Sequence, residues 1–139
     1  MSSNSCRRFF SIRISSLSFL SCEIRRFRQN AIAYTVQHGR LAFSAITRYE
    51  ICRGYIAQKA TAQLARFQIF CANSLIVPVT DSIFDRAADL WANAYQTGQP
   101  RADTDLIIAA TAIESGRVLV TGNTAHFSWI PNLVIEDWR

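Results

Sequence analysis

Carboxylate and amide side chains stand where predicted strands give way to helices. Glu50 follows one apolar run, Asn123 follows another, and Asp103 and Asp105 begin a predicted helix. In an open parallel sheet, ligands bind beyond the carboxyl ends of the strands, where such connections meet. Carboxylate and amide oxygens are hard ligands that suit Mg²⁺ or Mn²⁺. A metal held there could bind a phosphodiester and lower the pKa of a bound water. We therefore expect Glu50, Asp103 and Asp105 to converge at one rim of the sheet.

Each of these residues also has a structural interpretation, and spacing alone leaves both open. Asp103 is a good helix N-cap, and Asp105 is a favourable acid for a first helical turn. Glu50 could pair with Arg48 or Arg53, although its apolar neighbours predict that it is partly buried. The metal site is therefore a hypothesis that the elements around it must support.

Hydrolysis based on histidine or serine has little support in the sequence. His38 and His126 are the only histidines, and neither a G-x-S-x-G motif nor a glycine-rich phosphate loop is present. We expect His126 to pack or cap locally rather than act as a base. Asp81 is expected to begin a helix rather than bind a ligand.

The elements that must position these residues alternate between strands and helices. The predicted strands are 41–47, 75–80, 117–121 and 133–136, and the predicted helices are 48–59, 61–72, 82–96 and 103–115. Apolar strands between helices indicate an α/β, doubly wound fold, with a small parallel sheet flanked by helices on both faces. Pro78 places one strand at an edge, because proline cannot donate to a ladder. Gly116 is expected to end the last helix.

Three predicted helices carry apolar faces that should be buried. The helix over 82–96 has Ser82 and Asp85 at capping-box spacing, and its apolar row consists of Phe84, Ala87, Ala88, Trp91 and Tyr95. The helix over 103–115 is expected to bury Leu106, Ile107, Ala110 and Ile113, and the helix over 61–72 to bury Leu64, Phe67, Gln68 and Cys71.

The charge of the chain is concentrated in its first thirty residues. A chain of 139 residues, half of them hydrophobic, predicts one globular domain. Residues 1–30 hold six arginines against Glu23 alone, whereas residues 31–139 hold nine basic and nine acidic residues. The overall charge of +5 therefore belongs to the leader. The body gives no electrostatic evidence for a nucleic-acid partner, so any such partner must be argued from chemistry.

Cysteine spacing and apolar runs exclude two further classes. The four cysteines include no C-x-x-C pair, which argues against a structural zinc site. Cys52 and Cys71 fall in apolar helical segments, where a reduced buried thiol is expected, and this favours a cytoplasmic protein. No apolar run approaches the roughly 20 residues that cross a bilayer.

Residues 1–30 differ in kind from the remainder, because they are rich in serine and arginine and poor in acids. One interpretation is a targeting segment of the transit type. The other, which we favour, is that a changed reading frame or start codon replaced the original beginning of the domain. We therefore divide the chain into an atypical leader, 1–30, and a domain, 31–139.

Several segments of that domain resemble motifs of PIN domains of the VapC toxin type. Residues 46–54 (ITRYEICRG) are similar to the second motif of that family, and 103–112 (DTDLIIAATA) to the third. Residues 119–127 (LVTGNTAHF) and 130–138 (IPNLVIEDW) look like its usual ending. The matches occur in the family's order and spacing, which chance motifs seldom achieve.

The resemblance implies a Mg²⁺- or Mn²⁺-dependent endoribonuclease that acts on RNA, pairs with a cognate antitoxin and is often a homodimer. Carried over residue by residue, Glu50 and Asp105 are the central catalytic acids of the metal site. Asp103 is an accessory metal ligand, and Asn123 a polar catalytic residue near the metal or the attacking water. The implied location is the cytoplasm.

One part of the family pattern is absent. The family begins with a short apolar strand that ends in an aspartate, a principal metal ligand, and residues 1–30 contain no such motif. Glu23 is the only acid there that could substitute. We therefore expect residues 1–30 to be irregular, the first strand to be doubtful and the ribonuclease to be impaired. The alternative is a catalytically inactive PIN-like relic that only binds an antitoxin.

Overall fold

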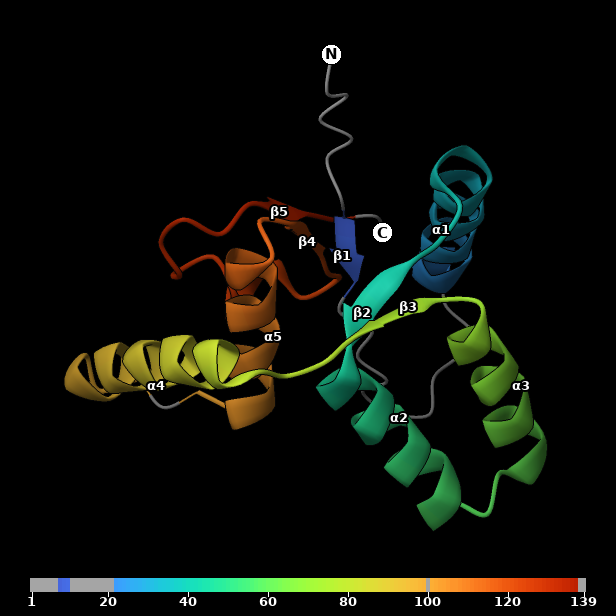
Figure 1. The fold of residues 1–139 in the computed structure, drawn as a ribbon, viewed down its shortest axis with the longest axis horizontal. Coiled ribbons are helices and arrows are strands. Elements are labelled where there is room, and N and C mark those ends of the chain that lie inside the picture. Colours follow the sequence, from blue (N-terminus) through green and yellow to red (C-terminus); the bar gives the residue numbers. More distant parts are fainter. Residues whose placement is uncertain (1–7, 11–21, 100, 138–139) are drawn as a thin grey trace.

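The computed structural model describes residues 8–10, 22–99 and 101–137. In chain order these form β1 (Arg8–Phe10), α1 (Cys22–His38), β2 (Ala42–Ser44), α2 (Ala45–Ala57), α3 (Thr61–Ala72), β3 (Leu75–Val77), α4 (Asp81–Gln96), α5 (Asp103–Glu114), β4 (Val118–Val120), the 3-10 helix η1 (Thr124–His126) and β5 (Ile135–Glu136). Figure 1 shows the sheet between α1 and α3 on one side and α4 and α5 on the other. The predicted α/β architecture is thus confirmed. Within the described residues, no helix has the length and apolar character needed to cross a membrane.

The five strands form one parallel sheet in the order β3-β2-β1-β4-β5. β3 lies at an edge, as Pro78 predicted, and this proline follows the strand directly. From β1 the chain builds outward through β2 and β3, and it then crosses to the other side to form β4 and β5. The topological switch point, where open sheets bind ligands, therefore lies between β1 and β4.

The position of β1 corrects our expectation for residues 1–30. We expected them to be irregular, yet Phe10 pairs with Phe43 of β2 and with Val120 of β4, so β1 is the central strand. α1 begins at Cys22 and continues across residue 30, where we expected the leader to end. The strand escaped prediction because it is very short and begins with an arginine, so it gives no apolar run. Residues 1–7 and 11–21 lie outside the described residues.

The first residue of β1 is tied to elements on both sides of it. The Arg8 side chain donates to both carboxylate oxygens of Glu136 in β5, with Nε to Oε2 at 2.8 Å and Nη2 to Oε1 at 3.2 Å. The Arg8 backbone N–H donates to the Tyr34 hydroxyl of α1 at 3.3 Å, and its guanidinium lies over the Tyr34 ring. These contacts replace the apolar burial that a serine- and arginine-rich segment was expected to lack.

The two faces of the sheet carry separate hydrophobic cores, because successive strand residues point to opposite faces. Ala42 and Leu119 face a core made with α4 and α5. Phe43 and Val120 face a second core, which is made with α1 and α3 and contains Tyr34 and Cys71. α5 is the most buried helix, with buried residues Leu106, Ile108, Ala109, Ala110, Thr111 and Ala112.

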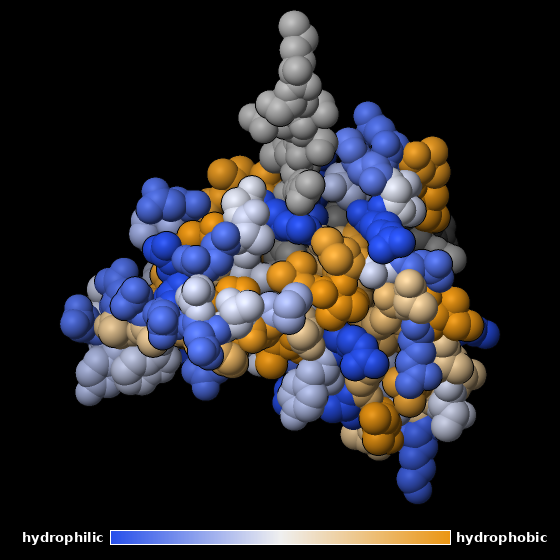
Figure 2. Space-filling view, viewed as in Figure 1, coloured by the Kyte–Doolittle hydropathy of each residue, from blue (hydrophilic) through white to orange (hydrophobic). Residues whose placement is uncertain are grey.

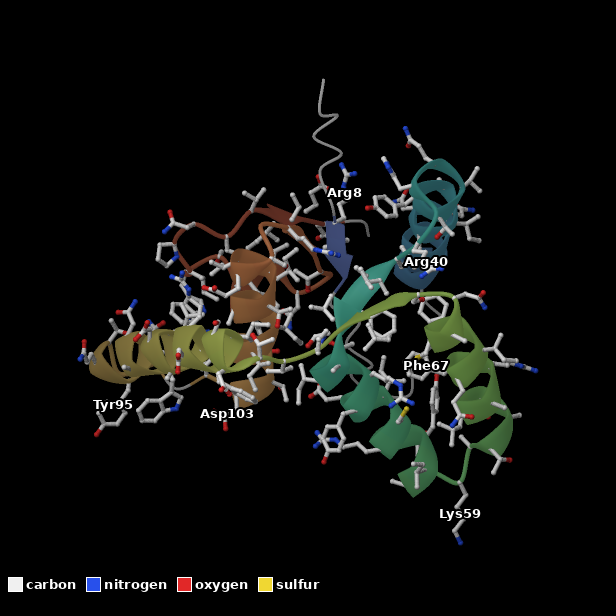
Figure 3. All side chains as sticks on the ribbon, viewed as in Figure 1. Arg8, Arg40, Lys59, Phe67, Tyr95 and Asp103 are labelled. Atoms are coloured by element: carbon white, nitrogen blue, oxygen red, sulfur yellow. The ribbon has the colours of Figure 1, made fainter. Side chains whose placement is uncertain are left out.

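α4 turns a different face to the core from the one we predicted. The exposed fractions of Phe84, Trp91 and Tyr95 are 51%, 47% and 70%, and Figure 3 shows Tyr95 pointing away from the molecule. The buried residues are instead Ile83, Ala87, Leu90 and Ala94. α4 packs on α5, whose contact surface is rich in alanine, so close approach favours the smaller row.

Helix termini also differ from the predicted ones. Thr80 caps α4 by accepting the Ile83 N–H, in place of the expected pair of Ser82 and Asp85. The N-cap residue of α5 is Ala102 rather than Asp103, and it makes no side-chain cap hydrogen bond. Gly116, with φ at +62°, follows the end of α5 as predicted. The bounds of α3 also match the prediction, although Gln68 is exposed.

The two described thiols are free, as expected. Cys71 is buried and Cys52 half-buried. Burial raises the pKa of the Cys71 thiol, and the nearby Arg48 only partly opposes this effect. Cys71 therefore stays protonated and acts as a packing residue.

Candidate functional site

The carboxyl ends of β2, β1 and β4 lie side by side, because β1 pairs with both neighbours. Ser44 ends β2 and Thr121 follows β4, and both residues are buried. Their hydroxyl groups close local turns. Ser44 Oγ accepts the Ile46 N–H at 3.2 Å, and Thr121 Oγ1 accepts the Asn123 N–H at 3.1 Å. β2 therefore ends earlier than predicted, because Ser44 is already the N-cap of α2.

Asp105 is the predicted ligand that the fold holds most firmly at this rim. It lies in the first turn of α5, and its side chain is 13% exposed. Its Oδ2 lies 3.2 Å from Nδ1 of His126 in η1, the turn that follows β4. The contact joins the beginning of α5 to the loop at the carboxyl end of β4. A largely buried carboxylate therefore stands beside the switch point of the sheet.

Glu50 lies on α2, which packs against α5. Its side chain is 26% exposed, so the partial burial predicted from its neighbours is confirmed. Glu50 Oε1 lies 3.8 Å from Nη2 of Arg53, one of the two arginines that we considered as structural partners. At that distance, and with a largely exposed arginine, the ion pair contributes little. The carboxylate is thus near the rim without a strong structural task.

Asp103 and Asn123 take different positions. Asp103 is exposed, and Figure 3 shows it on the outer side of the molecule, near the junction of α4 and α5. Asn123 is half-buried in the turn after β4, where its backbone carbonyl accepts the His126 N–H at 3.1 Å. Asn123 is therefore placed at the rim, whereas Asp103 is not directed into it.

The expected cluster of Glu50, Asp103 and Asp105 is not formed. Among the described residues, no three His, Cys, Asp or Glu side chains lie close enough to hold a metal ion together. What the structure brings together instead is the pair of Asp105 and His126. The assignment of Glu50, Asp103, Asp105 and Asn123 as site residues remains a prediction.

Sequence reasoning missed two polar groups near this rim. His126 was expected to pack locally, but the spacing of the sequence carries no signal for its contact with Asp105. Thr47 lies one helical turn before Glu50 and is fully buried. Its hydroxyl has no hydrogen-bond partner among the described residues. The threonine stands in the motif around Glu50, and its hydroxyl is a further oxygen near the rim.

A family model described as "PIN domain" matches residues 21–131. The chain belongs to the PIN domain family. The match begins after β1, so the family pattern lies in the part of this PIN domain that starts with α1.

Two curated relatives of this PIN domain are VapC proteins. It is 28% identical over 110 residues to ribonuclease VapC2 of Rickettsia felis, covering 78% of this chain and 82% of that protein. It is 29% identical over 108 residues to the tRNA(fMet)-specific endonuclease VapC of Salmonella typhimurium, covering 76% and 80%. Both are similarities in which most of each chain takes part.

Solved structures similar to this PIN domain are VapBC complexes. VapBC2 of Rickettsia felis bound to a promoter DNA fragment matches with a TM-score of 0.71 and 28% identity, covering 80% of this chain and 84% of that one. DNA-bound VapBC of Salmonella typhimurium matches with a TM-score of 0.73 and 24% identity, covering 95% and 98%. The second likeness concerns the fold alone, and it extends over nearly the whole chain.

Proposed function

We propose that this PIN domain is a VapC-type ribonuclease, the toxin of a type II toxin–antitoxin pair, which cleaves RNA internally with the help of a divalent metal. The observation that carries the proposal is the largely buried carboxylate of Asp105 beside the turn after β4. An open parallel sheet binds its ligand at this place. The names of the relatives, ribonuclease and endonuclease VapC, support the reaction class.

The residues at the rim fit a hard divalent cation in kind, although the described carboxylates are few. Asp105 and Glu50 offer carboxylates, Asn123 offers an amide, and the buried Thr47 hydroxyl lacks a hydrogen-bond partner among the described residues. Mg²⁺ and Mn²⁺ prefer such oxygens. Asp105 would be the main ligand, with Glu50 and Asp103 assisting. The metal would stabilise the charge of the phosphodiester and lower the pKa of the attacking water.

We infer that this site binds its metal weakly. β1 ends at Phe10, and the next residue of the sequence is Ser11, where the family pattern has an aspartate after its first strand. Serine carries no charge, so an anionic ligand is missing for Mg²⁺, which gives up its waters reluctantly. Cleavage should therefore be slow. The same observation favours the second candidate function, a PIN-like relic that binds an antitoxin without cleaving RNA.

The proposed partners are an RNA substrate and a cognate antitoxin protein, with a homodimer as the assembly and the cytoplasm as the location. Similar solved structures include a toxin–antitoxin complex from Klebsiella pneumoniae, with a TM-score of 0.62 and 27% identity. A protein partner also suits the surface, because Figure 2 shows hydrophobic residues over β2 and β3 and along α2 and α3. The exposed members include Tyr49, Ile56, Ile69 and Leu75. Groups of exposed apolar side chains favour association with proteins.

Cleavage of RNA by the full chain tests the ribonuclease directly. We would incubate the protein with a tRNA(fMet) transcript, the substrate named for the Salmonella relative, and with an unrelated single-stranded RNA. We expect slow cleavage with Mg²⁺ or Mn²⁺, none in EDTA, and none in Asp105→Ala, since that variant lacks the main proposed ligand.

Asp85→Ala is the matched control, because Asp85 is an exposed carboxylate of α4 outside the proposed site. It should cleave like the unaltered chain. Cleavage that continues undiminished in EDTA would refute metal dependence. Absence of cleavage at any metal concentration, with the fold intact, would favour the relic.

A further inference from the structure

His126 and Asp105 meet across the rim of the sheet although twenty residues separate them in the chain. His126 Nδ1 lies 3.2 Å from Asp105 Oδ2, and the carboxylate is 13% exposed, against 44% for the imidazole. An ionised carboxylate only accepts hydrogen bonds, so the proton of this contact belongs to Nδ1 of the histidine. Such a bond to a charged acceptor is stronger than one between neutral groups.

We propose that His126 is a positioning residue that fixes the orientation of the Asp105 carboxylate at the ligand-binding rim. This rests on the proposed function, because it gives Asp105 its task. A carboxylate ligand that is already hydrogen-bonded binds in one orientation, and loss of such a partner commonly weakens metal binding.

The turn that carries His126 is itself fixed at several points. The His126 N–H donates to the Asn123 carbonyl at 3.1 Å, and the next residue, Phe127, is buried. On the other side, the Trp129 indole N–H donates to the His126 carbonyl at 2.8 Å. The imidazole is therefore held by its backbone on both sides.

A second connection returns from this turn to the beginning of α5. The Arg101 guanidinium lies over the Trp129 ring, 5.0 Å from its centroid. Arg101 stands in the segment that leads into α5, where Asp105 occupies the first turn. The contacts thus form a closed circuit from Asp105 through His126, Trp129 and Arg101 back to α5. Such a circuit keeps the donor and the acceptor in register and holds the site in place before a ligand binds.

Two substitutions of His126 separate positioning from simple packing. His126→Leu removes the donor, whereas His126→Asn keeps an N–H close to the place of Nδ1. His38→Leu is the matched control, because His38 lies on α1 against the Tyr34 ring, outside the proposed site. Thermal unfolding of each full-length variant would verify that it folds.

The first measurement is the ¹⁵N NMR signal of the imidazole in the full chain, which requires neither metal nor activity. We expect the His126 Nδ1 signal to shift in Asp105→Asn, because the charged acceptor is lost, and to stay unchanged in Asp103→Asn. An Nδ1 signal that is the same in Asp105→Asn would overturn the contact and the proposal with it.

The second measurement is the affinity for Mn²⁺, determined by calorimetry on the folded variants. We expect His126→Leu to bind Mn²⁺ about tenfold or more weakly, and His126→Asn to recover most of the affinity. His38→Leu should match the unaltered chain. Unchanged or tighter Mn²⁺ binding in His126→Leu would overturn the positioning role. If the unaltered chain neither binds Mn²⁺ nor cleaves RNA, the proposed function fails, and the NMR signal still decides the contact.

Discussion

At the scale of single residues, the site is defined as much by a serine as by its carboxylates. The central strand that the family pattern requires is present, since β1 pairs on both sides, but Ser11 follows it. The defect that we infer is thus confined to one side chain and does not extend to a missing element. A single substitution can therefore test it, without replacement of the whole leader.

Ser11→Asp should restore an anionic ligand after β1. We expect Mn²⁺ affinity to rise by about tenfold or more, because the number of charged ligands governs affinity for hard cations. Cleavage of RNA in Mg²⁺ should rise with it. Ser11→Asn, which adds a similar volume without a charge, is the control and should change neither. Equal activity of the unaltered chain and Ser11→Asp would show that the serine is a genuine part of a functional site.

At the scale of elements, α4 shows that helical periodicity identifies a helix more securely than its buried face. Two apolar rows run along this helix, and the aromatic row faces solvent while the aliphatic row packs on α5. Trp91 and Tyr95 stack on each other on the outside, with ring centroids 5.1 Å apart. The aromatic row therefore covers part of its own surface and contributes little to the core.

Two alanine substitutions on α4 should differ strongly in stability. Leu90→Ala removes a buried side chain of the core, so we expect the free energy of unfolding to fall by about 2–4 kcal/mol. Tyr95→Ala alters a side chain that is 70% exposed, and we expect a change below about 1 kcal/mol. Urea denaturation would measure both values. A larger loss in Tyr95→Ala would contradict the observed face of α4.

The elements that could be predicted are those specified by neighbouring residues. The bounds of α3, the end of α5 before Gly116 and the edge position of β3 follow from local patterns and were predicted. β1, the buried face of α4 and the contact of His126 with Asp105 depend on partners that are distant in the chain. A sequence pattern contains the needs of a segment but not the identity of what will meet them.

At the scale of the whole molecule, the basic beginning of the chain is part of the fold. β1 separates β2 and β3 from β4 and β5, so the sheet is continuous only because this strand is present. Without it, β2 and β4 would expose unpaired backbone groups in the middle of the molecule, and such edges promote aggregation. The leader thus contributes to the architecture even though its composition is unusual for a central strand.

Deletion of residues 1–10 should therefore abolish stable folding. We expect the shortened chain to lose its cooperative thermal transition, because two ladders of the sheet disappear together. Circular dichroism during heating would measure this, and deletion of residues 1–6, which stops before β1, is the matched control. A cooperative transition in the chain that lacks residues 1–10 would contradict the central role of β1.

The ion pair between Arg8 and Glu136 should be the side-chain interaction that couples β1 to the far edge of the sheet. It spans β4 with two hydrogen bonds, and its side chains are 27% and 35% exposed. Solvent at that exposure limits the pair to about 1 kcal/mol or less. We expect Arg8→Ala and Glu136→Ala each to lower the free energy of unfolding, and the double variant to lose less than the sum of the two losses. Urea denaturation of the four proteins in a double-mutant cycle would give the coupling energy, which should decrease at high salt because ions screen a partly exposed pair. Fully additive losses would mean that Arg8 acts only through Tyr34, and that the two halves of the sheet are joined by backbone pairing alone.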